Sequence, residues 1–277
     1  MTPLIWLCFP QLLAVPVLVV EPETTSLKVG DPLIIKATLR NTTPKAIEVA
    51  RPFDAGWTGV MFDIRGPGDR EFRRACIWNQ GLKCGSARPP LINPGERLVT
   101  YERSVPPGQG EPDFSRPGVW RLRAFSQVNG RRLESNVVGI TVKKRPPAAE
   151  RAWDEHPKRV TDLLFRGASA DSDESAEFER QFAGSNAALT LVRARHLKAL
   201  RSAVTLRARQ DAMAAIRSFR EDLLPVTREY FDLETCNVLI GLKDFDAAEA
   251  LLKTITEPSG MKYGVFCNLE AHRPAKP

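Results

Sequence analysis

The residues of this sequence whose types could do chemistry are few, and their spacing favours structural roles. The three histidines, His156, His196 and His272, are far apart, and none stands in a motif typical of a catalytic triad or a metal site. The chain contains no Gly-rich phosphate loop, no G-x-S-x-G and no H-E-x-x-H motif. We therefore expect no catalytic residue, no metal site and no cofactor, and we predict that the protein is not an enzyme.

The cysteines suggest disulfide bonds rather than a catalytic thiol. Of the five, Cys8 lies in an apolar N-terminal run, and four remain if that run is removed. An even number in an exported chain suggests disulfides, and four cysteines allow three pairings. Because one pair falls in each half of the chain, the simplest prediction is Cys76–Cys84 and Cys236–Cys267. The alternative is free, buried thiols.

Basic residues outnumber acidic ones and give a formal net charge of +7. One group lies in the long connection over 65–90, next to a tryptophan, and another lies opposite the leucine stripe of a predicted helix. A partner would contact one of these groups, whereas the alternative is an ordinary solvated surface. No aromatic residue interleaves with the helical cations, which disfavours single-stranded nucleic acid. The candidate partner-contact residues are Trp78, Arg73, Arg74, Arg195, Lys198 and Arg209.

The first half of the chain, 17–143, has the pattern of a β-sandwich. Short β-prone runs alternate with Pro-, Gly- and Asn-containing turns. Trp120 and Leu122 alternate with Arg121 and Arg123, which predicts a strand with one buried face. We expect strands near residues 17–20, 33–39, 46–50, 58–64, 97–103, 119–125 and 132–142.

Two turns in this half are specific. Asn93-Pro94-Gly95-Glu96 places proline and glycine where a type II turn requires them. Asn129-Gly130 between two β-prone runs predicts a tight hairpin.

The second half is predicted to be helical. A Pro-containing linker over 144–149 precedes a separate all-α domain over 150–277. Ala212, Ile216, Phe219 and Leu223 form one helical stripe. Helices are expected over 187–204, 228–242 and 244–256, with Asp244 capping the last of them.

The apolar residues over 1–16 resemble a secretory leader. Pro10 and Pro16 interrupt the run, and a membrane-spanning helix needs about 20 consecutive apolar residues, so we expect no membrane span once the leader is removed. A membrane anchor is the alternative. The leader predicts a secreted, periplasmic or cell-envelope protein.

Two family resemblances follow from these motifs. The order "VGDPLIIKATLRNTT", "LINPGERLV", "SRPGVWRLRA" and "SNVVGITV" resembles bacterial extracytoplasmic immunoglobulin-like domains, including the sandwich named for intracellular proteinase inhibitors of bacilli. The segment "NVLIGLKDFDAAEALLKTITEP" resembles one tetratricopeptide repeat, within about 226–258. The resemblance implies an immunoglobulin-like sandwich followed by a tetratricopeptide-like helical hairpin.

The function expected from the sequence is that of a non-catalytic, exported binding or assembly module of a bacterial cell envelope, with an unidentified protein partner. A protease inhibitor of the sandwich type is the first alternative. The second alternative is binding of nucleic acid or an acidic partner through the basic helix.

Overall fold

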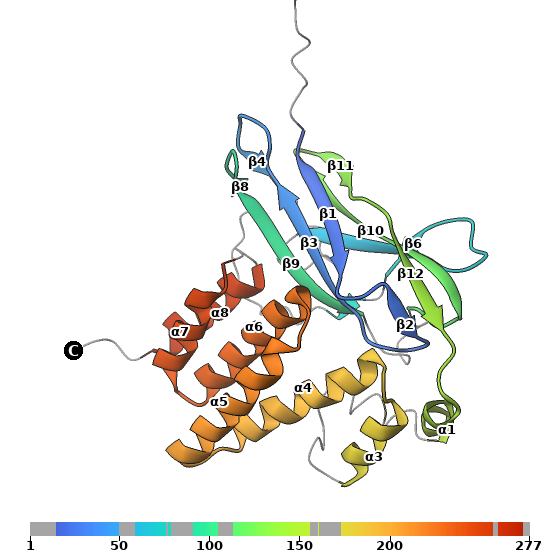
Figure 1. The fold of residues 1–277 in the computed structure, drawn as a ribbon. Coiled ribbons are helices and arrows are strands. Elements are labelled where there is room, and N and C mark those ends of the chain that lie inside the picture. Colours follow the sequence, from blue (N-terminus) through green and yellow to red (C-terminus); the bar gives the residue numbers. More distant parts are fainter. Residues whose placement is uncertain are drawn as a thin grey trace, which may run out of the picture.

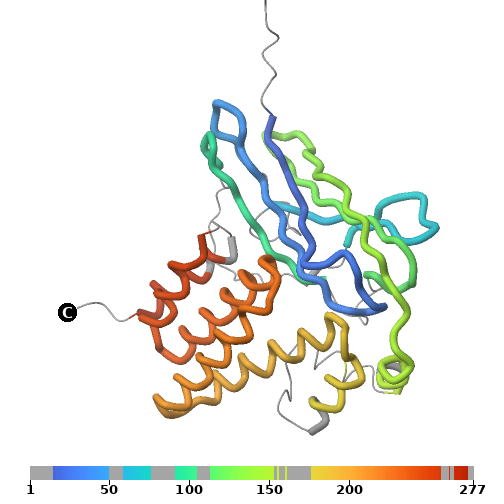
Figure 2. The backbone as a smooth tube through the Cα atoms, viewed as in Figure 1, coloured from blue at the N-terminus to red at the C-terminus, as the bar shows by residue number. Residues whose placement is uncertain are grey.

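The computed structural model describes residues 15–49, 59–75, 77–78, 91–104, 113–155, 160, 173–256 and 260–273. The N-terminal part of the described chain is rich in β-strands and the C-terminal part is helical (Figure 1). Figure 2 shows that the chain completes its sheets before it enters the helices. The predicted change from strands to helices near residue 144 is therefore confirmed.

The first sheet is antiparallel, with β3 between β1 and β9. Val19 of β1 lies opposite Thr38, and Ala37 lies opposite Thr100 of β9. The sheet consists, in spatial order, of β1 (Val17–Pro22), β3 (Ile34–Arg40), β9 (Arg97–Ser104) and β7 (Ile77–Trp78).

The second sheet is built around the long strand β10. β10 pairs antiparallel with β5, β11 and β12, whereas β2 joins the other side of β12 in parallel. A short pair, β4 (Ile47–Glu48) and β8 (Leu91–Ile92), forms a third sheet, and Val49 after β4 makes a β-bridge to Val128 of β10. The second sheet comprises, in order, β2 (Ser26–Lys28), β12 (Val138–Lys143), β10 (Gly118–Val128), β5 (Val60–Arg65) and β6 (Arg73–Arg74), with β11 (Arg131–Glu134) paired to β10.

One buried cluster lies between the two sheets and draws side chains from both. Trp120 at its centre has no exposed surface, its ring meets Phe114 edge-on at 5.5 Å, and its Nε1 donates to the Arg116 carbonyl at 2.8 Å. Leu122 and Ala124 are buried beside it while Arg121 is exposed, which confirms the predicted alternation.

Both specific turns are confirmed. Gly95 has a φ of 80°, and the Glu96 amide donates to the Asn93 carbonyl at 3.0 Å. Asn129 and Gly130 have φ values of 48° and 75°, the left-handed pair that a two-residue hairpin between β10 and β11 requires. The single strand expected over 132–142 is divided instead into β11 and β12, which pair with successive parts of β10 on the side away from β5.

Seven helices are described in the C-terminal part. Ser185, Thr205 and Asp244 cap three of them by accepting hydrogen bonds from backbone amides, as predicted for Asp244. The helices are α1 (Pro147–Glu155), α3 (Asp173–Gln181), α4 (Asn186–Arg201), α5 (Leu206–Glu221), α6 (Pro225–Gly241), α7 (Phe245–Thr254) and α8 (Gly260–His272). Helix α1 therefore begins inside the predicted linker, and α6 and α7 form the predicted hairpin.

The sequence predicted a separate helical domain, but the helical part packs against the first sheet. Helices α6 and α8 pack on β3 and β9 (Figure 1), and the outward side chains Ile34, Val99 and Tyr101 belong to the buried cluster of the helices. The first sheet is thus covered on both faces. The run Leu33-Ile34-Ile35, with all three residues buried, is the sequence signal of this arrangement, because a strand covered on one face alternates apolar with polar residues.

Predictions on the N-terminal leader largely fall on residues 1–14, outside the described part of the chain. The expected first strand at residue 17 is present as β1. No helix among the described residues is long and apolar enough to cross a membrane.

Candidate functional site

The cysteines do not form the predicted C-terminal disulfide. Cys236 of α6 and Cys267 of α8 are free. The Cys236 sulfur lies 3.6 Å from the Ala248 carbonyl oxygen, in the contact between α6 and α7, and burial raises the pKa of its thiol to about 12. The thiol is fully buried in the helical core. Cys76 and Cys84 lie outside the described residues.

The predicted basic helix face is partly neutralised by neighbouring elements. Arg195 donates two hydrogen bonds to Glu179 of α3, the shorter at 2.7 Å, and Arg209 lies 3.7 Å from Asp244 at the turn before α7. Lys198 is half-buried on the same helix as Arg195. The sequence of the helix could not reveal these acids, because they come from other elements.

The second predicted basic group, in the connection over 65–90, is divided between two environments. Arg73 donates to the buried Asp113 at 3.1 Å, and its guanidinium lies 6.0 Å from the centre of the Trp120 ring. Arg74 lies on the outward side of the second sheet, 3.8 Å from Asp63. The backbone of Trp78 is in β7, but its side chain is not described.

Arg74 belongs to a larger group on the second sheet, which we call the arginine face. On β5 and β10 the residues that point inward are buried in the cluster between the sheets, so the residues that alternate with them point outward. Sequence reasoning placed Arg121 and Arg123 on one face and predicted a strand over 58–64, but it did not predict that this strand lies beside them. The arginine face comprises Arg65, Arg74, Arg121, Arg123 and Arg132, with the acidic residues Asp63 and Glu134.

Several of these guanidinium groups lie over aromatic rings. Arg74 and Arg132 lie over Phe125, at 4.5 and 3.7 Å from the ring centre. Arg123 and Arg65 lie over Phe72, at 4.2 and 5.0 Å. Stacking of this kind fixes a planar group that can still offer its edge to two oxygen atoms of one anion.

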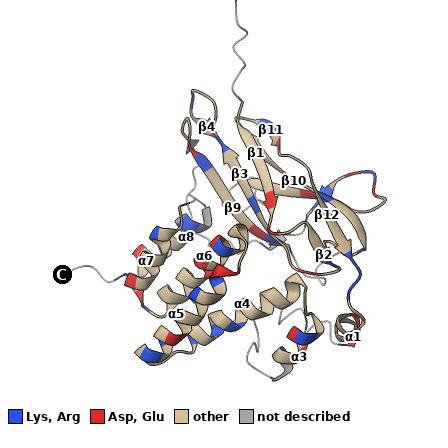
Figure 3. Ribbon diagram, viewed as in Figure 1, with Lys and Arg blue, Asp and Glu red and all other residues tan. Residues whose placement is uncertain are grey.

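Two carboxylates organise one end of the face. Asp63 accepts from Arg132 at 3.0 Å and from Arg123 at 3.3 Å. Glu134 accepts from the same two arginines, at 2.8 and 2.7 Å. The face therefore carries five arginines against two carboxylates, and the surplus is positive. Figure 3 marks the basic and acidic positions along the ribbon.

The arginine face has exposed side chains, whereas the described helices cover the first sheet. Val119, which shares its side of β10, has 59% of its surface exposed. Gly139 on β12 would bring an added Cβ only to a Val119 methyl, at 4.0 Å. The described helices that pack on a sheet do so on β3 and β9, in the other sheet.

A second polar cluster, buried between sheet and helices, holds the two parts together. Glu23 accepts from the Ile34 amide, from Asn186 of α4 and from Thr227 of α6, at 2.8, 3.0 and 2.7 Å. Burial raises the pKa of its carboxyl, against the charge of Arg193. These hydrogen bonds join three elements at one carboxylate.

Asp31 continues this junction. It accepts from the Lys28 amide at 3.0 Å and from the Asn186 amide, at the start of α4, at 3.2 Å. Burial raises the pKa of its carboxyl to about 6. Glu229 of α6 binds Lys36 at 3.4 Å and the Tyr101 hydroxyl, further along the same interface. These polar contacts therefore join the strands to the helices, and both kinds of element bury them.

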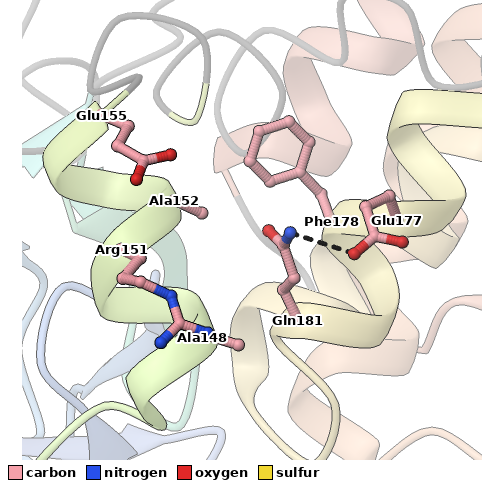
Figure 4. A pocket seen from close by; sticks show the side chains of 7 residues that line it. All are labelled: Ala148, Arg151, Ala152, Glu155, Glu177, Phe178 and Gln181. Carbon is pink, nitrogen blue, oxygen red and sulfur yellow. Dashed lines mark hydrogen bonds between the residues drawn. The ribbon is translucent and has the colours of Figure 1, made fainter.

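A cavity of about 360 Å³ lies between α1 and α3 (Figure 4). Gln181 donates to Glu177 across one side, at 3.1 Å, and Arg151 and Glu155 project from α1. Two carboxylates, Glu155 and Glu177, and the ring of Phe178 also line it. Among the described residues no group of three or more His, Cys, Asp or Glu side chains could hold a metal ion.

Comparisons with known proteins find weak structural likenesses only. No protein-family model and no curated protein matches the chain. The alkylpurine DNA glycosylase AlkC of Pseudomonas fluorescens, bound to DNA containing an abasic site analog, matches 46% of this chain over 30% of its own, at 13% identity and a TM-score of 0.30. A CARDB domain from Pyrococcus furiosus, in complex with di-metal ions, matches 47% over 88% of its own chain, at 11% identity and a TM-score of 0.27.

A PapD-like (ASH) domain of human CEP192 matches 46% of the chain over 87% of its own, at 10% identity and a TM-score of 0.22. The chain thus spans less than a third of the glycosylase chain that it matches. Immunoglobulin-like and PapD-like domains are among these neighbours, but scores this low do not identify the type of fold or the function.

Proposed function

We propose that this protein is a non-catalytic binding module that holds an anionic partner on its arginine face. The observation that carries the proposal is an open sheet with five outward arginines and two acids, four of those arginines fixed over aromatic rings. Preorganised guanidinium groups lose little side-chain entropy when they bind an oxyanion, so they favour recognition. The remaining sheet supports the helices.

The fold and location belong to the same proposal. We assign the two-sheet part to immunoglobulin-like sandwiches of the proteinase-inhibitor type, and the α6–α7 pair to tetratricopeptide-like hairpins. Support comes from the edge of the sandwich, where β1 lies in one sheet and β2, a few residues later, lies in the other. The apolar run over 1–16 supports export to the cell envelope.

The proposal is tested with three labelled anionic probes: poly-L-glutamate, polyphosphate and a single-stranded thymidine oligonucleotide. We expect fluorescence anisotropy to detect binding of at least one probe, with affinity that falls as salt rises. Arg74→Glu should weaken this binding by about tenfold or more, because it places a repulsive charge on the face.

The matched control is Arg207→Glu. Arg207 is exposed on α5, far along the chain from the sheet, and the substitution changes net charge by the same amount. We expect less than about a twofold loss of affinity. Equal losses for the two variants, or no binding of any probe by the wild-type protein, would contradict the proposal.

A further inference from the structure

The geometry points to one empty position on the arginine face, the pair Arg65 and Arg121, and assigns it to a carboxylate of an acidic, extended protein segment. This inference rests on the proposed function and deepens it, because it names the partner's chemistry. It begins from the register of the sheet.

Arg65 and Arg121 lie directly opposite each other on β5 and β10. Like charges in this relation repel and destabilise a sheet. Arg74, Arg123 and Arg132 each have a carboxylate partner, whereas no carboxylate in the described part of the chain pairs with Arg65 or Arg121. The fold therefore keeps a repulsive pair that an external carboxylate would relieve.

Space for such a group is present beside the pair. The other neighbour of Arg121, on β12, is Gly139. An added Cβ at Gly139 would meet only one methyl carbon, of Val119, and Val119 is itself exposed. Because Gly139 has no side chain, an extended chain can approach the guanidinium groups here without displacing a side chain.

The occupied end of the face shows what these arginines bind. There, Asp63 and Glu134 each receive hydrogen bonds from Arg123 and Arg132. A carboxylate is thus already the anion that completes the pattern at one end, whereas none of the described residues places one at the other. Charge complementarity extends the pattern to a carboxylate that a partner supplies.

A protein segment suits the face better than a nucleic acid. Single-stranded nucleic acids stack their bases on exposed aromatic rings, but Phe125 is only 2% exposed beneath Arg74 and Arg132. Side chains on one face of an extended peptide repeat every two residues, about 6.6–6.8 Å. One acidic side chain of such a segment would bind the pair Arg65 and Arg121, because Asp63 and Glu134 already bind Arg123.

The test is Arg121→Glu, with poly-L-glutamate as the probe. The introduced carboxylate lies opposite Arg65, so it should occupy the position that the probe needs. We expect affinity for poly-L-glutamate to fall by about tenfold or more while the melting temperature rises, because repulsion is replaced by attraction. Loss of binding together with gain of stability is a result that a merely structural arginine would not give.

Arg131→Glu is the matched control. Arg131 is exposed next to the hairpin turn and alternates with Arg132, so its side chain belongs to the other side of β11. We expect its affinity to change by less than about twofold. An equal loss in both variants, or a lower melting temperature in Arg121→Glu, would overturn the inference.

The thymidine oligonucleotide separates the inference from the proposed function. Tighter binding of the oligonucleotide than of poly-L-glutamate, lost on Arg74→Glu, would leave the arginine face as the binding surface and overturn the assignment to a protein carboxylate. Failure of the wild-type protein to bind any of the anionic probes would overturn both.

Discussion

Replacing Glu102 by glutamine is expected to stabilise the protein by on the order of 4 kcal/mol at about pH 9 and to change little at about pH 4. Glu102 lies on β9 and is buried, and its described hydrogen bond comes from Thr100, at 3.3 Å. Burial raises the pKa of its carboxyl to about 8, from 4.5. Glutamine keeps an oxygen acceptor for Thr100 and carries no charge.

The direction of this pH dependence follows from the number of protons that the folded and unfolded states bind. Between the two pKa values the folded protein holds a proton that the unfolded chain has released, so stability is greatest below about pH 4.5 and falls as the pH rises to about 8. The slope is about 1.4 kcal/mol per pH unit in this interval. Asp31, with its pKa raised to about 6, adds a similar loss at lower pH in both proteins.

Urea unfolding followed by circular dichroism across this pH range measures the effect. The wild-type free energy of unfolding should decline more steeply between about pH 6 and 8 than that of Glu102→Gln, in which the other buried carboxyls, Glu23 and Asp31, still lose stability. Parallel pH profiles for the two proteins would show that the burial of Glu102 carries no such penalty.

Trp120→Ala is expected to lower the free energy of unfolding by about 3–5 kcal/mol. The side chain fills the centre of the cluster between the two sheets and contacts the Phe114 ring. Its removal leaves a cavity and leaves the Arg116 carbonyl without the Nε1 donor. Urea unfolding followed by circular dichroism measures the loss without relying on tryptophan fluorescence.

Val119→Ala is the control on the same strand. Val119 precedes Trp120 but points to the exposed side of β10, and its truncation should cost less than about 0.5 kcal/mol. A comparable loss at both positions would mean that the inward face of β10 does not carry the stability of the two-sheet part.

The sequence predicted what depends on local periodicity and turn chemistry. The two-residue alternation around Trp120 defined which side of β10 is buried, and Asn129-Gly130 defined the hairpin that follows. The capping residue Asp244 likewise marked where α7 begins. These signals lie within a few residues of the structure that they specify.

What the sequence did not predict depends on register and packing between distant segments. Arg65 and Arg121 are neighbours only because β5 pairs with β10 in one register, and no local pattern specifies that pairing. The same holds for Arg195, whose partner Glu179 comes from another helix. The helices that cover Ile34 were signalled only by a continuous apolar run.

The central claim is that the arginine face is the surface that binds an anionic partner. The most direct measurement follows the arginine Nε–Hε resonances of ¹⁵N-labelled protein by NMR while poly-L-glutamate is added. We predict that the largest shifts belong to Arg65, Arg74, Arg121, Arg123 and Arg132. Shifts confined to the helical arginines Arg195, Arg207 and Arg209, with the sheet resonances unchanged, would contradict the account.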